Sequence, residues 1–164
     1  MSGYKLRVQS YFFTTFSSKN TYSGEIYQVA GDLQKMKKRI LIVDDDLSIL
    51  KLLNFILTKE YEIVVKNNGM DAFTWLEDGN IPELIISDLQ MPYFDGQSFI
   101  KNVKISGLFR DIPIIMLSAA HDLEVQVGNM PFQVDAYMPK PFNPTSLKSA
   151  INQVLNIYDP AHIN

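Results

Sequence analysis

The chain contains 164 residues, of which 46% are hydrophobic and 20% are charged, a balance typical of a folded globular domain. Its net charge of −3 leaves no basic surplus for direct binding of nucleic acid, and the absence of cysteine excludes disulfide bonds, thiolate nucleophiles and cysteine-based zinc sites. Because no apolar run reaches the roughly 20 residues that span a bilayer and no signal-peptide pattern opens the chain, we expect a cytoplasmic protein without membrane insertion.

The first 35 residues differ in composition from the rest. They hold seven of the nineteen aromatic residues, mixed with Ser, Thr and Asn. Met36 then opens a basic stretch that leads directly into an apolar run, as the start of a soluble protein often does. Residues 1–35 are therefore either an extension upstream of the biological start or an appendage that packs on the domain or binds a partner. We expect one domain over residues 36–158 and a short tail at 159–164.

From Met36 onward, short apolar runs alternate with segments of helical periodicity. In the segment 47–59, for example, Leu52, Leu53 and Ile56 recur on one helix face. The apolar runs lack a period of two, so both faces of their sheet should be covered, which predicts an α/β fold with five parallel strands and five helices. Strands are predicted at 39–43, 61–65, 84–87, 112–117 and 134–138, and helices at 47–59, 68–78, 97–106, 122–129 and 145–158.

Polar side chains stand where the predicted strands end. They are Asp44, Asp45 and Asp46 after the first strand, Asp88 after the third, Ser118 after the fourth and Lys140 after the fifth. Each has an ordinary structural explanation when taken singly: Asp46 as a helix N-cap, Asp88 in a turn, Lys140 as a solvated charge. However, ligands of an open parallel sheet bind at the carboxyl ends of the strands, so we expect these side chains to gather at one edge.

Crowded carboxylates are costly unless a cation shares their site or some of them stay protonated. Oxygen ligands, few in number and with room for water, favour Mg²⁺ over Ca²⁺. A cation beside a lysine suits phosphoryl groups, because both neutralise charge on the phosphoryl oxygens while the Ser118 hydroxyl donates to a third. Asp88 ends the central strand and is the predicted nucleophile, which would form an acyl phosphate, and Asp44 and Asp45 are predicted to hold the metal.

Over residues 38–157 the sequence resembles the receiver domain of two-component response regulators. Four motifs carry the resemblance, and together in this order they are highly specific. They are Ile40-Leu41-Ile42-Val43-Asp44-Asp45-Asp46, Ile85-Ile86-Ser87-Asp88-Leu89-Gln90-Met91-Pro92-Tyr93-Phe94-Asp95-Gly96, Ile114-Ile115-Met116-Leu117-Ser118-Ala119 and Tyr137-Met138-Pro139-Lys140-Pro141-Phe142. The resemblance implies a flavodoxin-like, doubly wound sheet with the strand order 2-1-3-4-5.

The resemblance also implies a role for each residue of the site. Asp88 would accept a phosphoryl group from a phosphohistidine on a sensor histidine kinase or a histidine phosphotransfer protein. Lys140 would pair with that group, and its peptide bond to Pro141 would be cis. The ligands of Mg²⁺ would be Asp44, Asp45, Asp88 and the backbone carbonyl of Gln90. Of the acidic pair, Asp45 is the expected direct ligand, with Asp44 acting through water.

By the same resemblance, phosphorylation would operate a two-state switch. Ser118 would move toward the phosphoryl group, Tyr137 would rotate inward, and an unidentified protein effector would read the change on the face of the fourth helix, fifth strand and fifth helix. Tyr137 also has an alternative interpretation as an ordinary core residue. Such a domain catalyses only its own phosphorylation and dephosphorylation, so we expect no enzyme acting on an external substrate.

The segment 121–136 departs from the family pattern. Pro131, with Gly128 close before it, is expected to shorten the fourth helix, which puts the usual docking and dimerisation surface in question and leaves a homodimer open. In the loop after Asp88, Gly96 is expected to supply the freedom of a turn. No output segment follows the fifth helix, so we expect a stand-alone receiver.

Three alternative functions compete with the phosphorylated switch. A degenerate receiver would act as a phosphorylation-independent interaction module, although Asp88 and Lys140 are both present. A flavin or nucleotide binder would need a glycine- or hydroxyl-rich cradle after the first strand, where three aspartates stand instead. A magnesium-dependent phosphatase would show an Asp-x-Asp pattern that Asp88-Leu89-Gln90 lacks. The sequence therefore favours a phospho-accepting signalling switch.

Overall fold

The computed structural model describes residues 37–92, 95–119 and 127–158. The chain divides between Met36 and Lys37 into two units, and the fold described below is that of the second. The predictions for residues 1–35 and for the tail at 159–164 lie outside the described residues.

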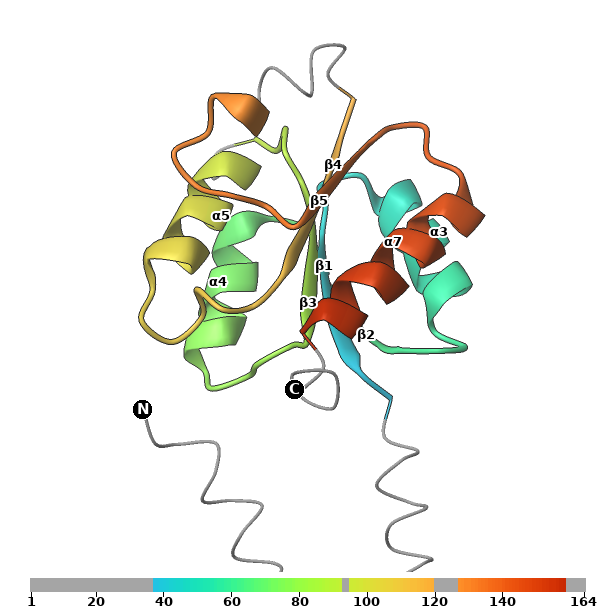
Figure 1. The fold of residues 1–164 in the computed structure, drawn as a ribbon, viewed down its shortest axis with the longest axis horizontal. Helices are drawn as coiled ribbons and strands as arrows, with labels where there is room; N and C mark the ends of the chain where they lie inside the picture. Colours follow the sequence, from blue (N-terminus) through green and yellow to red (C-terminus); the bar gives the residue numbers. More distant parts are fainter. Residues whose placement is uncertain (1–36, 93–94, 120–126, 159–164) are drawn as a thin grey trace, which may run out of the picture. The chain divides into compact units, whose positions relative to one another are not determined.

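Five parallel strands form one sheet. They are β1 (Arg39–Val43), β2 (Glu62–Lys66), β3 (Leu84–Asp88), β4 (Ile114–Ser118) and β5 (Ala136–Pro139). Their order across the sheet is β2-β1-β3-β4-β5, which confirms the expected flavodoxin-like topology (Figure 1). The side chains of β3 and β4 are buried throughout, as are all but the first of β1, because these central strands are covered on both faces. The edge strands β2 and β5 are partly exposed.

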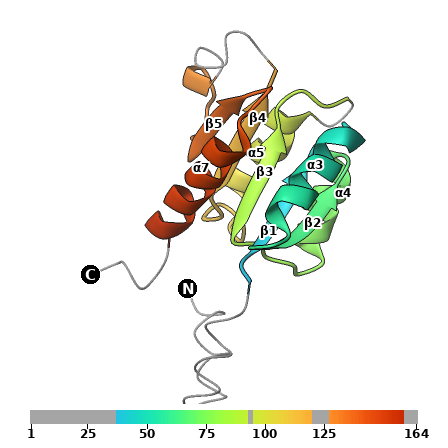
Figure 2. The same cartoon turned by 90° about the vertical axis from the view of Figure 1, so that its right-hand side faces the viewer.

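Four helices within the described residues cover the two faces of the sheet. They are α3 (Leu47–Leu57), α4 (Gly69–Glu77), α5 (Gly96–Ile105) and α7 (Pro144–Ile157). In both views α3 and α7 lie on one face, and α4 and α5 lie on the other (Figures 1 and 2). Each face encloses its own core, with Leu53 and Ile151 in the first and Ala72 and Phe99 in the second. None of these described helices combines the length and the apolar character needed to cross a membrane.

Three strands begin later than the sequence pattern predicted: β2 by one residue, at Glu62, and β4 and β5 by two residues each. β4 begins at Ile114 rather than at residue 112, because Pro113 has no N–H with which to join a strand ladder. β5 begins at Ala136 rather than at residue 134, and Val134 packs against the core without being part of the strand. Apolar character marks burial, whereas the bounds of a strand depend on which backbone groups are paired.

The inward face of α3 differs from the predicted one. Leu50, Leu53 and Leu57 are buried against the sheet, whereas Leu52 is 42% exposed, so its predicted place on the inward face is wrong. The helix is apolar on more than one side, and its packing on β1 and β2 selected the buried stripe. The predicted helix at 122–129 lies mostly outside the described residues, of which only 127 and 128 are helical.

Side-chain caps start the helices that follow the strand ends. Asp46 is the N-cap of α3 and accepts a hydrogen bond from the Ser48 N–H, as the sequence predicted. Asn143 caps α7 in the same way, with Pro144 in the first turn. These caps leave only a few residues between each strand and its helix, so the side chains of those residues are held near the strand end.

Candidate functional site

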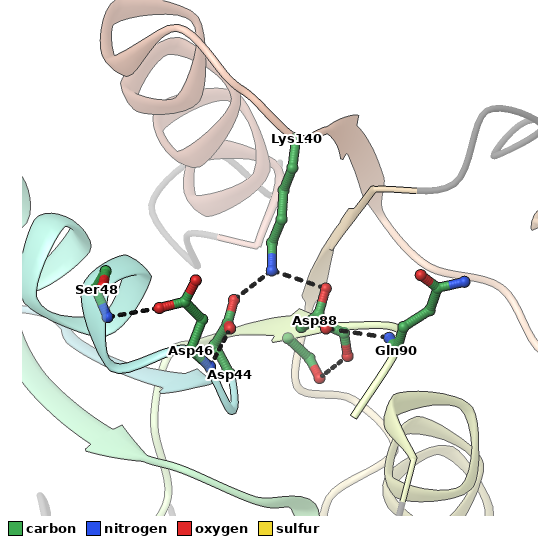
Figure 3. A network of polar contacts seen from close by, with 7 residues as sticks. Asp44, Asp46, Ser48, Asp88, Gln90 and Lys140 are labelled. Atoms are coloured by element: carbon green, nitrogen blue, oxygen red, sulfur yellow. Dashed lines mark hydrogen bonds and ion pairs between the residues drawn. The ribbon is translucent and has the colours of Figure 1, made fainter. Parts of the chain in front are cut away.

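The predicted polar residues come together at the carboxyl ends of the strands. Asp44 directly follows β1, Asp88 ends β3, Ser118 ends β4 and Lys140 directly follows β5. Since all five strands are parallel, these four positions lie along one edge of the sheet. Figure 3 shows Lys140 reaching down from the end of β5 between Asp44 and Asp88.

The Lys140 ammonium is bonded to two carboxylates at once. Its Nζ lies 2.6 Å from Oδ2 of Asp44 and 2.9 Å from Oδ1 of Asp88 (Figure 3). The side chains of Asp44 and Asp88 are only 1% and 5% exposed, and that of Lys140 is 16% exposed. Burial by itself would lower the pKa of Lys140, but the hydrogen bonds and charges of the two aspartates outweigh it and raise the pKa. The lysine is therefore a fixed positive charge at the centre of the site.

The three consecutive aspartates have three different environments. Asp44 is buried and accepts a hydrogen bond from the Asp46 N–H at 2.9 Å. Asp45 is exposed. Asp46 is the cap of α3, and the hydrogen bond from the Ser48 N–H is the main reason that its pKa is lowered. Capping of α3 thus uses the carboxylate of Asp46, and the carboxylates of Asp44 and Asp45 are available to the site.

Asp44, Asp45 and Asp88 together form a set of ligands suited to a hard cation. Each offers one carboxylate oxygen, and these oxygens lie within 4.8 Å of one another. Burial raises the pKa of Asp44, as does the nearby charge of Asp88, although hydrogen bonds from Lys140 and the Asp46 amide oppose the rise. One ammonium does not offset three carboxylates, so the donor atoms and the excess negative charge both fit Mg²⁺.

The loop after β3 holds the Asp88 carboxylate in place. The Gln90 N–H donates to Oδ2 of Asp88 at 3.1 Å, while the Gln90 side chain points away from it (Figure 3). The Ser87 hydroxyl donates to the backbone carbonyl of Asp88 at 3.0 Å. Since Oδ1 forms an ion pair with Lys140 and Oδ2 accepts a hydrogen bond from the backbone N–H of Gln90, the rotation of this carboxylate is restricted.

Gly96 makes a closer approach to Asp88 than the sequence suggested. A Cβ at this position would lie 1.9 Å from the backbone carbonyl oxygen of Asp88 and 2.8 Å from the Cα of Leu89. The Gly96 N–H also donates to the Leu89 carbonyl at 3.1 Å. Glycine is required here because there is no room for a side chain between the start of α5 and the end of β3. The freedom of a turn, which we expected to explain this glycine, is not the reason.

Ser118 and Tyr137 differ sharply in exposure. Ser118 is fully buried at the end of β4, and its carbonyl accepts a hydrogen bond from the Lys140 N–H at 2.7 Å. Tyr137, on β5, is 42% exposed, which rules out the alternative interpretation of it as an ordinary core residue in this conformation. The Lys140–Pro141 peptide is cis, as the resemblance implied.

One polar cluster was not predicted from the sequence. Asp135, immediately before β5, bonds to groups from α5, β4 and the end of α7 at the opposite edge of the sheet. The only signal in the sequence is an acidic residue next to an apolar strand, which does not identify its partners.

The comparisons with known proteins all identify the same family. Residues 40–152 match the model of the response regulator receiver domain family. A probable transcriptional regulator named ycf27 from Cyanophora paradoxa is 35% identical over 73% of this chain and 48% of its own length. The phosphate regulon transcriptional regulatory protein PhoB from Escherichia coli is 32% identical over 76% of this chain and 55% of its own. The chain thus spans about half the length of the curated relatives it matches.

Solved structures agree with this comparison. The chemotaxis protein CheY4 of Vibrio cholerae has a TM-score of 0.65 at 28% identity, covering 72% of this chain and 98% of its own. The signal receiver domain of a histidine kinase from Syntrophus aciditrophicus has a TM-score of 0.69 at 29% identity, covering 77% and 96%. The similarity therefore extends over nearly the whole of each of these two solved chains.

Proposed function

Because the chain belongs to the response regulator receiver family, and so is a signalling domain rather than a conventional enzyme, we propose that Asp88 is its phosphoacceptor. The phosphoryl group would come from a phosphohistidine on a sensor histidine kinase or a histidine phosphotransfer protein. The observation that supports this most directly is the contact of the Lys140 ammonium with the buried Asp88 carboxylate at 2.9 Å.

In the proposed reaction an oxygen of Asp88 attacks the phosphorus of the donor. The P–O bond forms as the P–N bond to the histidine breaks, and the electron pair of that bond stays on the ring nitrogen. With a proton on its other nitrogen, the ring leaves as neutral imidazole. Lys140 offsets the negative charge of the acyl phosphate, and the Ser118 hydroxyl is proposed to donate a hydrogen bond to a phosphoryl oxygen.

Mg²⁺ is the proposed cofactor, held by Asp44, Asp45, Asp88 and the backbone carbonyl of Gln90. When bound, it would neutralise charge on the phosphoryl oxygens and so lower the barrier to transfer. Asp45 is proposed as a direct ligand, and its exposed carboxylate is consistent with exchange of the ion with solvent. Asp44, bonded to Lys140 and to the Asp46 N–H, is proposed to act through water.

Phosphorylation is proposed to change the conformation that a partner protein recognises. Ser118 moves toward the phosphoryl group, and Tyr137, which is exposed in the structure described here, rotates inward. The chain would act in the cytoplasm on a protein effector, without cycles of turnover on an external substrate. The two relatives compared above are named as a probable transcriptional regulator and a transcriptional regulatory protein, and the chain spans only about half of their length.

The experiment that tests this function is intact-protein mass spectrometry after incubation with acetyl phosphate and Mg²⁺. We expect the added mass of one phosphoryl group on the unmodified chain and none on Asp88→Asn. Asp46→Asn is the matched control, because asparagine caps a helix as well as aspartate does and Asp46 lies outside the ligand set. Phosphorylation of Asp88→Asn to the same extent would contradict the assignment. If neither Mg²⁺ nor phosphate bound, a phosphorylation-independent interaction module would be favoured.

A further inference from the structure

A second polar cluster lies at the amino ends of β4 and β5, whereas the aspartates of the site lie at the carboxyl ends of the strands. We call it the far-edge cluster, and it consists of Lys104 near the end of α5, Asp135 immediately before β5, and Tyr158 immediately after α7. Oδ2 of Asp135 accepts a hydrogen bond from the Ile114 N–H at 2.7 Å and lies 3.7 Å from Nζ of Lys104. Oδ1 of Asp135 accepts a hydrogen bond from the Tyr158 hydroxyl. A single carboxylate therefore joins α5, β4, β5 and the end of α7.

Lys104 and Asp135 are largely buried in this cluster, whereas Tyr158 is 44% exposed. The side chains of Lys104 and Asp135 are each 16% exposed, and the Lys104 ammonium also donates to the carbonyls of Arg110 and Ile112. The hydrogen bond to Asp135 is the main reason that the pKa of Tyr158 is raised to about 12. The Asp135 N–H donates to the Ile114 carbonyl, which is a second hydrogen bond between Asp135 and the start of β4.

Strand β5 connects this cluster to the phosphoacceptor site. It has only four residues, with Asp135 bonded at one end and Lys140 bonded to Asp44 and Asp88 at the other. On its inward face Ala136 and Met138 pack against the same core as α7, and the two elements lie side by side in both ribbon views (Figures 1 and 2). Because β5 is extended and has only four residues, we expect a shift of its Lys140 end to be transmitted to its Asp135 end.

We propose that the far-edge cluster couples the phosphorylation state of Asp88 to the C-terminal end of α7, with β5 as the connecting element. The inference rests on the proposed function of Asp88. When Lys140 moves from Asp44 toward the phosphoryl group, β5 shifts, the Asp135–Tyr158 hydrogen bond weakens, and the last turn of α7 opens more often. Tyr158 and Asp135 are thus positioning residues that touch neither the donor nor the phosphoryl group.

Hydrogen exchange followed by mass spectrometry tests the coupling in the full chain. Loss of one hydrogen bond predicts that backbone amides at 154–158 exchange about threefold to tenfold faster after treatment with acetyl phosphate and Mg²⁺. In Tyr158→Phe this segment should exchange at the faster rate before treatment, with no further increase afterwards. Tyr61→Phe is the matched control, because the Tyr61 hydroxyl also donates a hydrogen bond to α7, but to Asn152 at 2.7 Å and not to Asp135. It should keep the full response.

Intact mass on the same samples separates the two ways in which this can fail. Absence of the added phosphoryl mass means that the proposed function has failed, and the coupling fails with it. Added mass with unchanged or slower exchange at 154–158 overturns the coupling alone, as does a full response in Tyr158→Phe. If Tyr158→Phe does not fold, Asp135→Asn gives the same comparison, because it keeps the size of the side chain while weakening its bond to the Tyr158 hydroxyl.

Discussion

The Lys140 ammonium lies closer to Asp44, at 2.6 Å, than to Asp88, at 2.9 Å. The lysine therefore has a second buried partner besides the proposed phosphoacceptor. In this conformation it stabilises two carboxylates that come from neighbouring strands and would otherwise repel each other. The same contacts that prepare the site for a phosphoryl group also contribute to the stability of the fold.

Removal of this ammonium should destabilise the fold. Lys140→Met keeps an unbranched apolar stem but leaves Asp44 and Asp88 buried without their cation, and breaking a buried ion pair in this way costs about 3 kcal/mol. Urea unfolding without Mg²⁺ measures the loss. Lys148→Met is the control, because Lys148 pairs with Glu60 at the surface and its removal should cost well under about 1 kcal/mol. Equal losses in the two variants would contradict the role assigned to Lys140.

The acidic cluster should lower the stability of the metal-free fold. Asp45→Asn removes one of three crowded carboxylates and should increase the free energy of unfolding without Mg²⁺ by about 1 kcal/mol. The same variant should gain less stability when Mg²⁺ is added, because one proposed ligand is lost. Thermal unfolding with and without the ion measures both effects. A variant that is less stable without Mg²⁺ and still gains as much from it as the unmodified chain would argue against a metal site here.

Gly96 should tolerate no side chain. In Gly96→Ala the new Cβ would collide with the carbonyl of Asp88, so the end of β3 or the start of α5 must move, at a cost of about 3 kcal/mol. Since the moved backbone carries the phosphoacceptor, phosphorylation by acetyl phosphate should also slow. Gly107→Ala is the matched control, because a Cβ there would meet nothing within 4 Å. Similar stability of the two variants would show that the loop relaxes without cost.

Tyr158 should titrate well above the ordinary pKa of a tyrosine. Its pKa is raised from 10.0 to about 12, chiefly by its hydrogen bond to Asp135. A raised pKa means that the bond stabilises the fold fully below pH 10 and that this contribution disappears as the pH rises through about 12. The phenolate absorbance of the unmodified chain should include a step near pH 12 that Tyr158→Phe lacks. A step that persists in this variant would mean that another group titrates there.

Much of the fold was readable from local patterns. The apolar runs from Arg39 and from Leu84 were assigned to strands, and both are strands. The position of Asp88 at the end of β3 followed from the same pattern, since the apolar run stops there. The bounds of β4 and β5 did not follow, because pairing of backbone groups and not hydrophobicity decides where a strand begins.

By itself, the sequence determined the alternation of strands and helices and the kinds of side chain at one edge of the sheet, because these depend on hydrophobic periodicity and chain direction. Only the tertiary structure decided that Asp44 is buried against Lys140 while Asp45 is exposed, since consecutive side chains leaving a strand point in different directions. It also decided that Leu52 faces solvent and that Asp135 meets Tyr158. Such contacts join residues far apart in the chain, and their geometry exists only once the elements have packed.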